Sequence, residues 1–145
     1  MKLRLATIVE RVEDILRGRI LPLLDDDFAK NEIHLSASLL SMTRMAREDE
    51  VALKVDELDK LRDIFAQAAG VVEDAALSER LRTAAGSALP GLTISALDAE
   101  TGRLRALLVD LHAHVEEMAG DDARRIDREI WRLMRDVEAK RAPRA

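Results

Sequence analysis

Apolar residues recur at intervals of three and four along every long segment of this chain, and no segment alternates apolar and polar residues. The three-to-four spacing places side chains on one face of an α-helix, whereas alternation would indicate a strand. The pattern therefore predicts an all-α fold, an up-and-down bundle of about five helices. We expect one domain over residues 1–142 and a short polar tail at residues 143–145.

Proline and glycine mark the predicted helix ends. The first helix covers about residues 2–21, where Pro22 ends or kinks it. Neither Gly nor Pro occurs between residues 28 and 69, so the simplest prediction is one very long helix closed by Gly70. The remaining helices are predicted at about 72–85, at 95–118 with Ser95 as its capping residue, and from Asp121 or Asp122 onward.

The apolar stripe of the predicted 28–69 helix changes face along its length. A first group of side chains shares one side of the helix: Phe28, Leu35, Leu39, Met42 and Ala46. A second group is rotated by about a third of a turn: Val51, Val55, Leu58, Leu61 and Phe65. The helix therefore either changes neighbours near residues 47–50 or breaks there into two.

The second of these groups is the predicted interface. A continuous helix over residues 28–69 would be about 63 Å long, which is more than the other predicted helices can cover. We expect Val51, Val55, Leu58, Leu61 and Phe65 to be buried by a second copy in a homodimer. Trp131 lies at the edge of its helix stripe and is predicted to be a further contact residue at the rim.

A semi-polar strip on the long helix is the candidate for ligand binding. Five side chains fall within about a third of its circumference: Asn31, His34, Ser38, Ser41 and Met45. The strip predicts either a pocket in which His34 contacts a small ligand, or a place where small serines let another helix approach closely. Packing is the simpler interpretation.

Two histidines, His112 and His114, stand among carboxylates in the stretch DLHAHVEE. On a helix they point about 160° apart, so they cannot hold one metal ion together. The simplest interpretation places His114 in a surface ion pair with Asp110 and Glu117. A di-metal carboxylate centre needs Glu-x-x-His, which is absent from the sequence. We therefore predict no metal and no cofactor.

Histidine phosphotransfer is an alternative because the bundles that perform it carry an exposed histidine on a long helix. The similarity is architectural only. Those families typically follow the histidine with a pattern like H-x-L-K-G, whereas Glu116 and Glu117 follow here and would repel a phosphoryl group.

Composition excludes several further classes. The chain has no cysteine, which removes disulfides and thiolate sites, and the net charge of −5 with few aromatic residues argues against nucleic-acid binding. The apolar start ends at Glu10, too early for a signal peptide or a membrane span, so we expect a cytoplasmic protein without membrane contact. The preference for arginine over lysine, 18 to 5, suggests a bacterial source.

These observations do not identify one function. We expect a non-enzymatic helical-bundle protein of interaction or regulation that forms a homodimer, with another protein as an alternative partner. The main alternative is a small-ligand-binding bundle with its pocket near His34. Histidine phosphotransfer and di-metal chemistry rank behind both.

Overall fold

The computed structural model describes residues 4–141, with side chains at all of these positions except 46–48. This part of the chain contains helices and no strand, which confirms the all-α prediction. Contacts divide the chain into two compact units, residues 1–50 and 51–145. The single domain over residues 1–142 stays a prediction, and the predicted tail at 143–145 lies outside the described residues.

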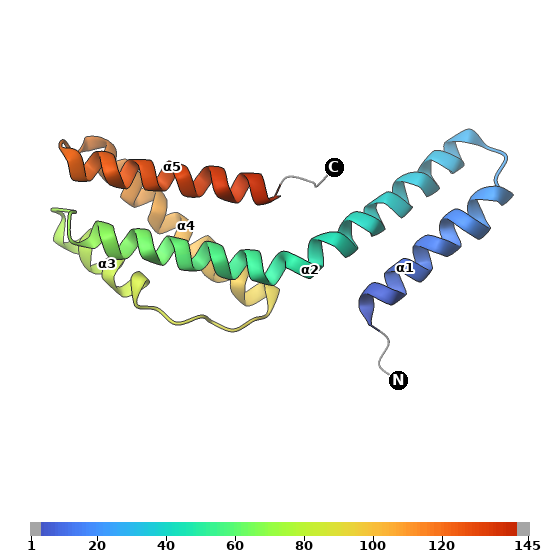
Figure 1. Cartoon of the computed structure of the whole chain (residues 1–145), viewed down its shortest axis with the longest axis horizontal. Helices are drawn as coiled ribbons and strands as arrows, with labels where there is room; N and C mark the ends of the chain where they lie inside the picture. Colours follow the sequence, from blue (N-terminus) through green and yellow to red (C-terminus); the bar gives the residue numbers. More distant parts are fainter. Residues whose placement is uncertain (1–3, 142–145) are drawn as a thin grey trace. The chain divides into compact units, whose positions relative to one another are not determined.

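Unit 1, residues 1–50, is a helical hairpin. Its first arm is α1 (Leu5–Ile15), continued by a π-helical turn (Leu16–Ile20) and a 3₁₀ turn (Leu21–Leu23). Pro22 sits in that last turn, where its fixed φ and missing N–H end the helix as predicted. The chain then reverses into the first part of α2, which runs back along α1 (Figure 1).

The second arm belongs to α2 (Asp27–Ala69), a continuous α-helix of 43 residues. Its first turn is capped by Asp26, whose Oδ2 accepts a hydrogen bond from the backbone N–H of Ala29 at 2.8 Å. The very long helix expected over residues 28–69 is thus confirmed. The boundary between the two units falls between Glu50 and Val51 along the chain, at the end of the segment where the sequence predicts a change of face.

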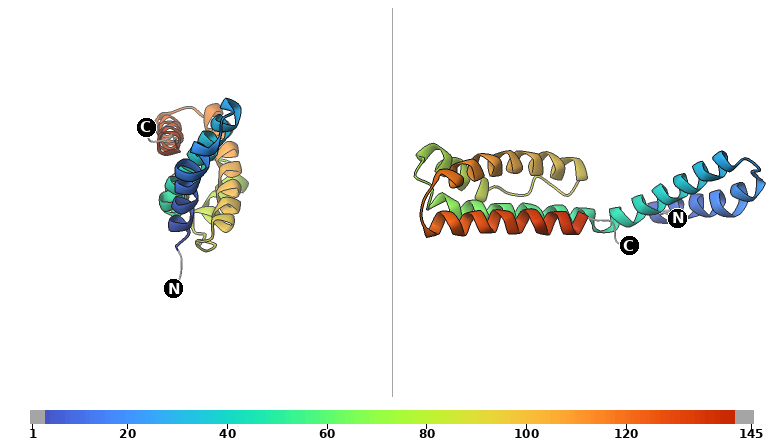
Figure 2. Two further views of the ribbon diagram at one scale, coloured as in Figure 1. Left: turned by 90° about the vertical axis from the view of Figure 1, so that its right-hand side faces the viewer. Right: turned by 90° about the horizontal axis from the view of Figure 1, so that it is seen from above.

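Unit 2, residues 51–145, combines the second part of α2 with three more helices. These are α3 (Ala75–Ala85), α4 (Ile94–Glu117) and α5 (Asp121–Arg141). Thr93, not the predicted Ser95, caps α4, because the Thr93 hydroxyl accepts the N–H of Ala96. Gly120, with φ of 111°, makes the tight reversal between α4 and α5 (Figure 2).

The core of unit 2 is continuous and draws on all four of its helical segments. Its largest fully buried side chains are Leu58, Leu61, Phe65, Leu81, Leu97, Leu104, Leu111, Ile126 and Ile130. Ion pairs bridge the helices around this core. Glu57 of α2, itself buried, pairs with Arg105 of α4 and Arg141 of α5. Lys60 of α2 pairs with Asp136 of α5, so these two helices lie side by side.

Every helix described in residues 4–141 is too short or too polar to cross a lipid bilayer.

Candidate interaction site

Unit 1 has almost no core. Within its described residues, Ala37 is the one fully buried side chain, and neither α1 nor the two turns that follow it bury any residue. Val9 on α1, Leu16 in the π-helical turn, and Ile33 and Leu40 on α2 are only partly covered. The hairpin therefore leaves most of its apolar surface in contact with water.

The exposed apolar surface of α1 forms a regular stripe. Leu5, Ile8, Val12 and Ile15 follow one another at intervals of three, four and three, and each is about 40–50% exposed. This spacing is the heptad pattern with which helices pack against one another in coiled coils. We call these four residues the α1 stripe.

The first part of α2 carries a second stripe with the same spacing. Phe28, Leu35, Leu39 and Met42 are between 53% and 70% exposed. Glu32 fills the heptad position between Phe28 and Leu35, so the full run is apolar except for one carboxylate. We call the four apolar residues the α2 stripe. The opposite face of this part of α2 is also apolar, and its residues Ile33, Ala37 and Leu40 are buried or partly buried.

The two stripes differ in the charges that accompany them. Arg4, Arg11 and Arg19 lie on the arm of α1, and none of them forms a side-chain hydrogen bond or ion pair with another described residue. Glu32 on α2 has no such partner either, and three aspartates, residues 25–27, precede it. The α1 stripe thus has unpaired cations beside it, and the α2 stripe has an unpaired carboxylate within it.

The predicted ligand-binding strip lies on the exposed surface of unit 1. Asn31, His34, Ser38 and Met45 are exposed and Ser41 is partly exposed. Ser38 accepts a long hydrogen bond, 3.5 Å, from Arg17. Two described grooves are both in unit 2, so neither includes any of the five residues. A pocket near His34 remains a prediction without a cavity to support it.

The residues of the interface predicted on the second part of α2 have packing partners within the chain. Leu58, Leu61 and Phe65 are at most 1% exposed because the core of unit 2 covers them, and Val51 and Val55 pack against that core. These side chains therefore have the internal partners that the sequence argument denied them. The uncovered stripe is on the first part of the helix instead, and its heptad spacing was the signal in the sequence.

Trp131, the sixth predicted interface residue, is 49% exposed on α5. Its neighbour is His112 of α4, whose ring meets the indole edge to face with the centroids 5.6 Å apart. Nε2 of His112 also lies 3.1 Å from Oδ1 of Asp127. The aromatic pair joins α4 to α5.

The expected surface ion pair of His114 is not formed. Arg80 of α3 takes Asp110 at 2.7 Å, and Nε2 of His114 is buried with no hydrogen-bond partner among the described atoms. In the described residues, no three His, Asp or Glu side chains converge as a metal site requires.

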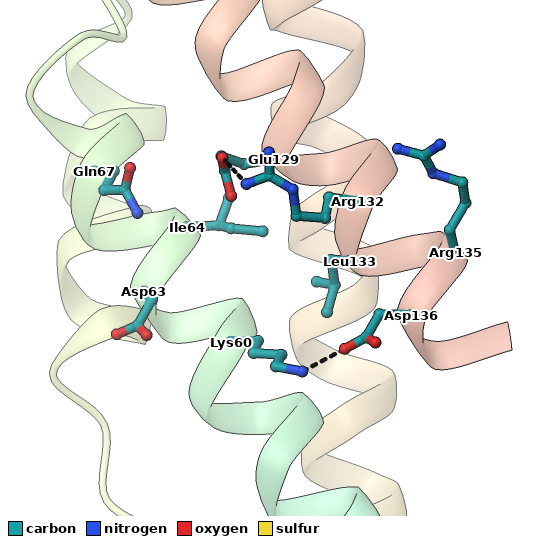
Figure 3. Close-up of a pocket in the computed structure, with 9 residues that line it drawn as sticks. All are labelled: Lys60, Asp63, Ile64, Gln67, Glu129, Arg132, Leu133, Arg135 and Asp136. Carbon is teal, nitrogen blue, oxygen red and sulfur yellow. Dashed lines mark hydrogen bonds and ion pairs between the residues drawn. The ribbon is translucent and has the colours of Figure 1, made fainter. Parts of the chain in front are cut away.

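A groove of about 570 Å³ separates α2 and α5 in unit 2 (Figure 3). Ile64 and Leu133 form its apolar part. Three basic and three acidic side chains line it, and four of them pair, Lys60 with Asp136 and Arg132 with Glu129 at 2.6 Å. Since these cations and anions neutralise each other, the groove offers no concentrated charge of one sign to a ligand.

The described structure thus defines an all-α protein with one well-packed helical unit and one hairpin that displays two apolar stripes. No protein-family model, curated protein or solved structure matches the chain significantly.

Proposed function

We propose that this protein is a cytoplasmic, non-enzymatic interaction or regulatory protein that self-associates as a homodimer through unit 1. The observation that carries the proposal is the pair of exposed heptad stripes on α1 and α2. Stripes of this kind in a water-exposed protein are commonly buried by another helix.

The energetics of the hairpin support a partner. Ordering a helix costs roughly 1–2 kcal/mol per residue in backbone entropy, and the 11 residues of α1 bury no side chain fully in return. An isolated helix of this length is marginal in water. Covering the two stripes supplies the missing apolar burial, so association and folding of unit 1 support each other.

The area of the stripes fits a dimer. At their observed exposures the eight stripe side chains present roughly 800 Å², the area that each partner gives to an interface of standard size. The rival functions have weaker support. His34 adjoins no described cavity, and the environment of His112 is acidic, with Asp127 and Glu116 as its charged neighbours.

Sedimentation velocity at micromolar concentration tests the proposal. We expect a mass of twice the 16.2 kDa chain for the unaltered protein. Leu39→Glu places a carboxylate within the α2 stripe and should give a monomer, because burying an unpaired charge is costly.

Ser36→Glu is the matched control, since it adds the same charge at an exposed position of α2 outside the stripe. It should remain a dimer. A monomeric unaltered protein at these concentrations would contradict the proposal, as would a Leu39→Glu variant that dimerises normally.

A further inference from the structure

We infer that the α1 stripe of one copy packs on the α2 stripe of a second copy, with the two helices antiparallel. The inference rests on the proposed self-association and specifies which surfaces meet. The alternatives within the same proposal are pairing of α1 with α1 and of α2 with α2.

Charge disfavours the pairing of α2 with α2 and favours that of α1 with α2. Residues 4–24 carry four basic and three acidic side chains, whereas residues 25–50 carry three basic and seven acidic ones. Pairing α2 with α2 would bring two acidic surfaces together, and like charges across a helix interface disfavour association. Pairing α1 with α2 sets the unpaired cations of α1 against the unpaired carboxylate of α2.

The heptad spacings also match in the antiparallel direction. When α1 and α2 run antiparallel, residue numbers rise along one helix as they fall along the other. The stripes then form four layers of opposed residues: Leu5 with Met42, Ile8 with Leu39, Val12 with Leu35, and Ile15 with Glu32. Arg19 belongs to the π-helical turn that follows Ile15, so this pairing places it beside the layer formed by Ile15 and Glu32. Three layers are therefore wholly apolar, and the fourth sets the Glu32 carboxylate against Ile15, one helical turn from Arg19.

Each copy offers one α1 stripe and one α2 stripe. In a two-fold dimer the pairing is made twice, and both stripes of both copies are covered. The second copy thereby supplies the cover that unit 1 lacks by itself.

Disulfide trapping tests the pairing directly, because the chain has no cysteine of its own. Val12→Cys and Leu35→Cys are made in separate chains, distinguished by a mass tag, and mixed under mild oxidation. We expect the mixture to yield mainly the Val12–Leu35 linked heterodimer, at least several-fold above the level that either variant reaches alone. Ser36→Cys mixed with Val12→Cys is the control and should link slowly, since Ser36 lies outside the α2 stripe.

A charge exchange gives an independent readout. Glu32→Arg should weaken dimerisation by roughly threefold or more, and Arg19→Glu likewise, as expected for exposed ion pairs made twice. The double variant Glu32→Arg with Arg19→Glu should recover affinity relative to either single variant.

The outcomes separate the two proposals. Efficient linking of Leu35→Cys to itself, with no excess of heterodimer, would overturn the α1–α2 pairing and leave self-association standing. A monomer mass for the unaltered chain would overturn both. Binding of the monomer to phosphatidylglycerol vesicles, lost in Val12→Glu, would show that a lipid surface covers the stripes and would overturn the second copy as occupant.

Discussion

Glu57 of α2 accepts a hydrogen bond of 2.6 Å from Nε of Arg105 of α4, although the two residues are 48 positions apart in the sequence. The Glu57 side chain is only 8% exposed, and Arg141 of α5 lies 3.3 Å from its second oxygen. One buried carboxylate therefore holds three helices of unit 2 through two guanidinium groups.

Removing Arg105 should be costly because a buried carboxylate loses its closer partner. We expect Arg105→Ala to lower the free energy of unfolding of unit 2 by about 2–3 kcal/mol. Adding Glu57→Met in that background should restore a large part of the loss, since no buried charge remains. Urea unfolding followed by the fluorescence of Trp131, the single tryptophan, measures unit 2. Equal stabilities of the single and double variants would contradict this explanation.

Acid should weaken unit 2 through its paired carboxylates. Hydrogen bonds from Lys140 and then Lys60 lower the pKa of Asp56 below its ordinary value of 3.8, and a hydrogen bond from Arg103 lowers the pKa of Glu100 below 4.5. A carboxylate with a lowered folded-state pKa stabilises the fold above its unfolded-state pKa, and this contribution is lost as the pH falls through the folded value.

The free energy of unfolding should therefore be level above pH 4.5 with respect to these groups and should fall below it. Asp56→Asn should flatten that fall, whereas Asp63→Asn, which removes an exposed carboxylate without an ion pair among the described residues, should keep it. Unfolding titrations between pH 7 and about pH 3 compare the variants. An unchanged slope in Asp56→Asn would refute the assignment.

Trp131 should report on His112. The imidazole of His112 contacts the indole edge to face, with the ring centroids 5.6 Å apart. His112→Ala should therefore change the emission of Trp131 and lower the free energy of unfolding of unit 2 by about 0.5–1.5 kcal/mol. His114→Ala is the matched control, because His114 lies on another side of α4 and lines the groove at α3. Similar emission changes in both variants would show that the contact is not the cause.

Loss of association should unfold α1 while sparing unit 2. Val12→Glu places a charge in the α1 stripe and should lower helicity measured by circular dichroism at micromolar concentration, because α1 buries no residue fully by itself. The urea transition of Trp131 should stay within about 0.5 kcal/mol of its normal position. Diluting the unaltered protein should reproduce the loss of helicity, and helicity independent of concentration would count against the coupling.

The helices can be predicted from the sequence, but the segments that cover their apolar faces cannot. Helix periodicity, Pro22, Gly70 and the absence of helix breakers over residues 28–69 predict the helices and the long α2. Periodicity identifies an apolar face but not what covers it, because that depends on tertiary packing. Leu58 and Leu39 are thus equivalent in the sequence, yet the former is fully buried and the latter is 53% exposed.

Contacts between side chains of different helices were the least predictable part of the structure. Glu57 with Arg105, and His112 with Trp131, join different helices, and no local spacing rule pairs residues that far apart. The rule of three and four proposed Asp110 for His114, but Arg80 of a neighbouring helix is the partner that Asp110 takes.

The tight reversal at Gly120 has a consequence for the order of folding. It makes contacts between α4 and α5 local, as in His112 with Asp127 only 15 residues on, whereas Lys60 meets Asp136 across 76 residues. Closing a short loop costs less entropy than closing a long one, so the α4–α5 pair should form ahead of the docking of α2. In kinetic terms, truncating Ile126 should slow folding, while truncating Leu61 should mainly speed unfolding.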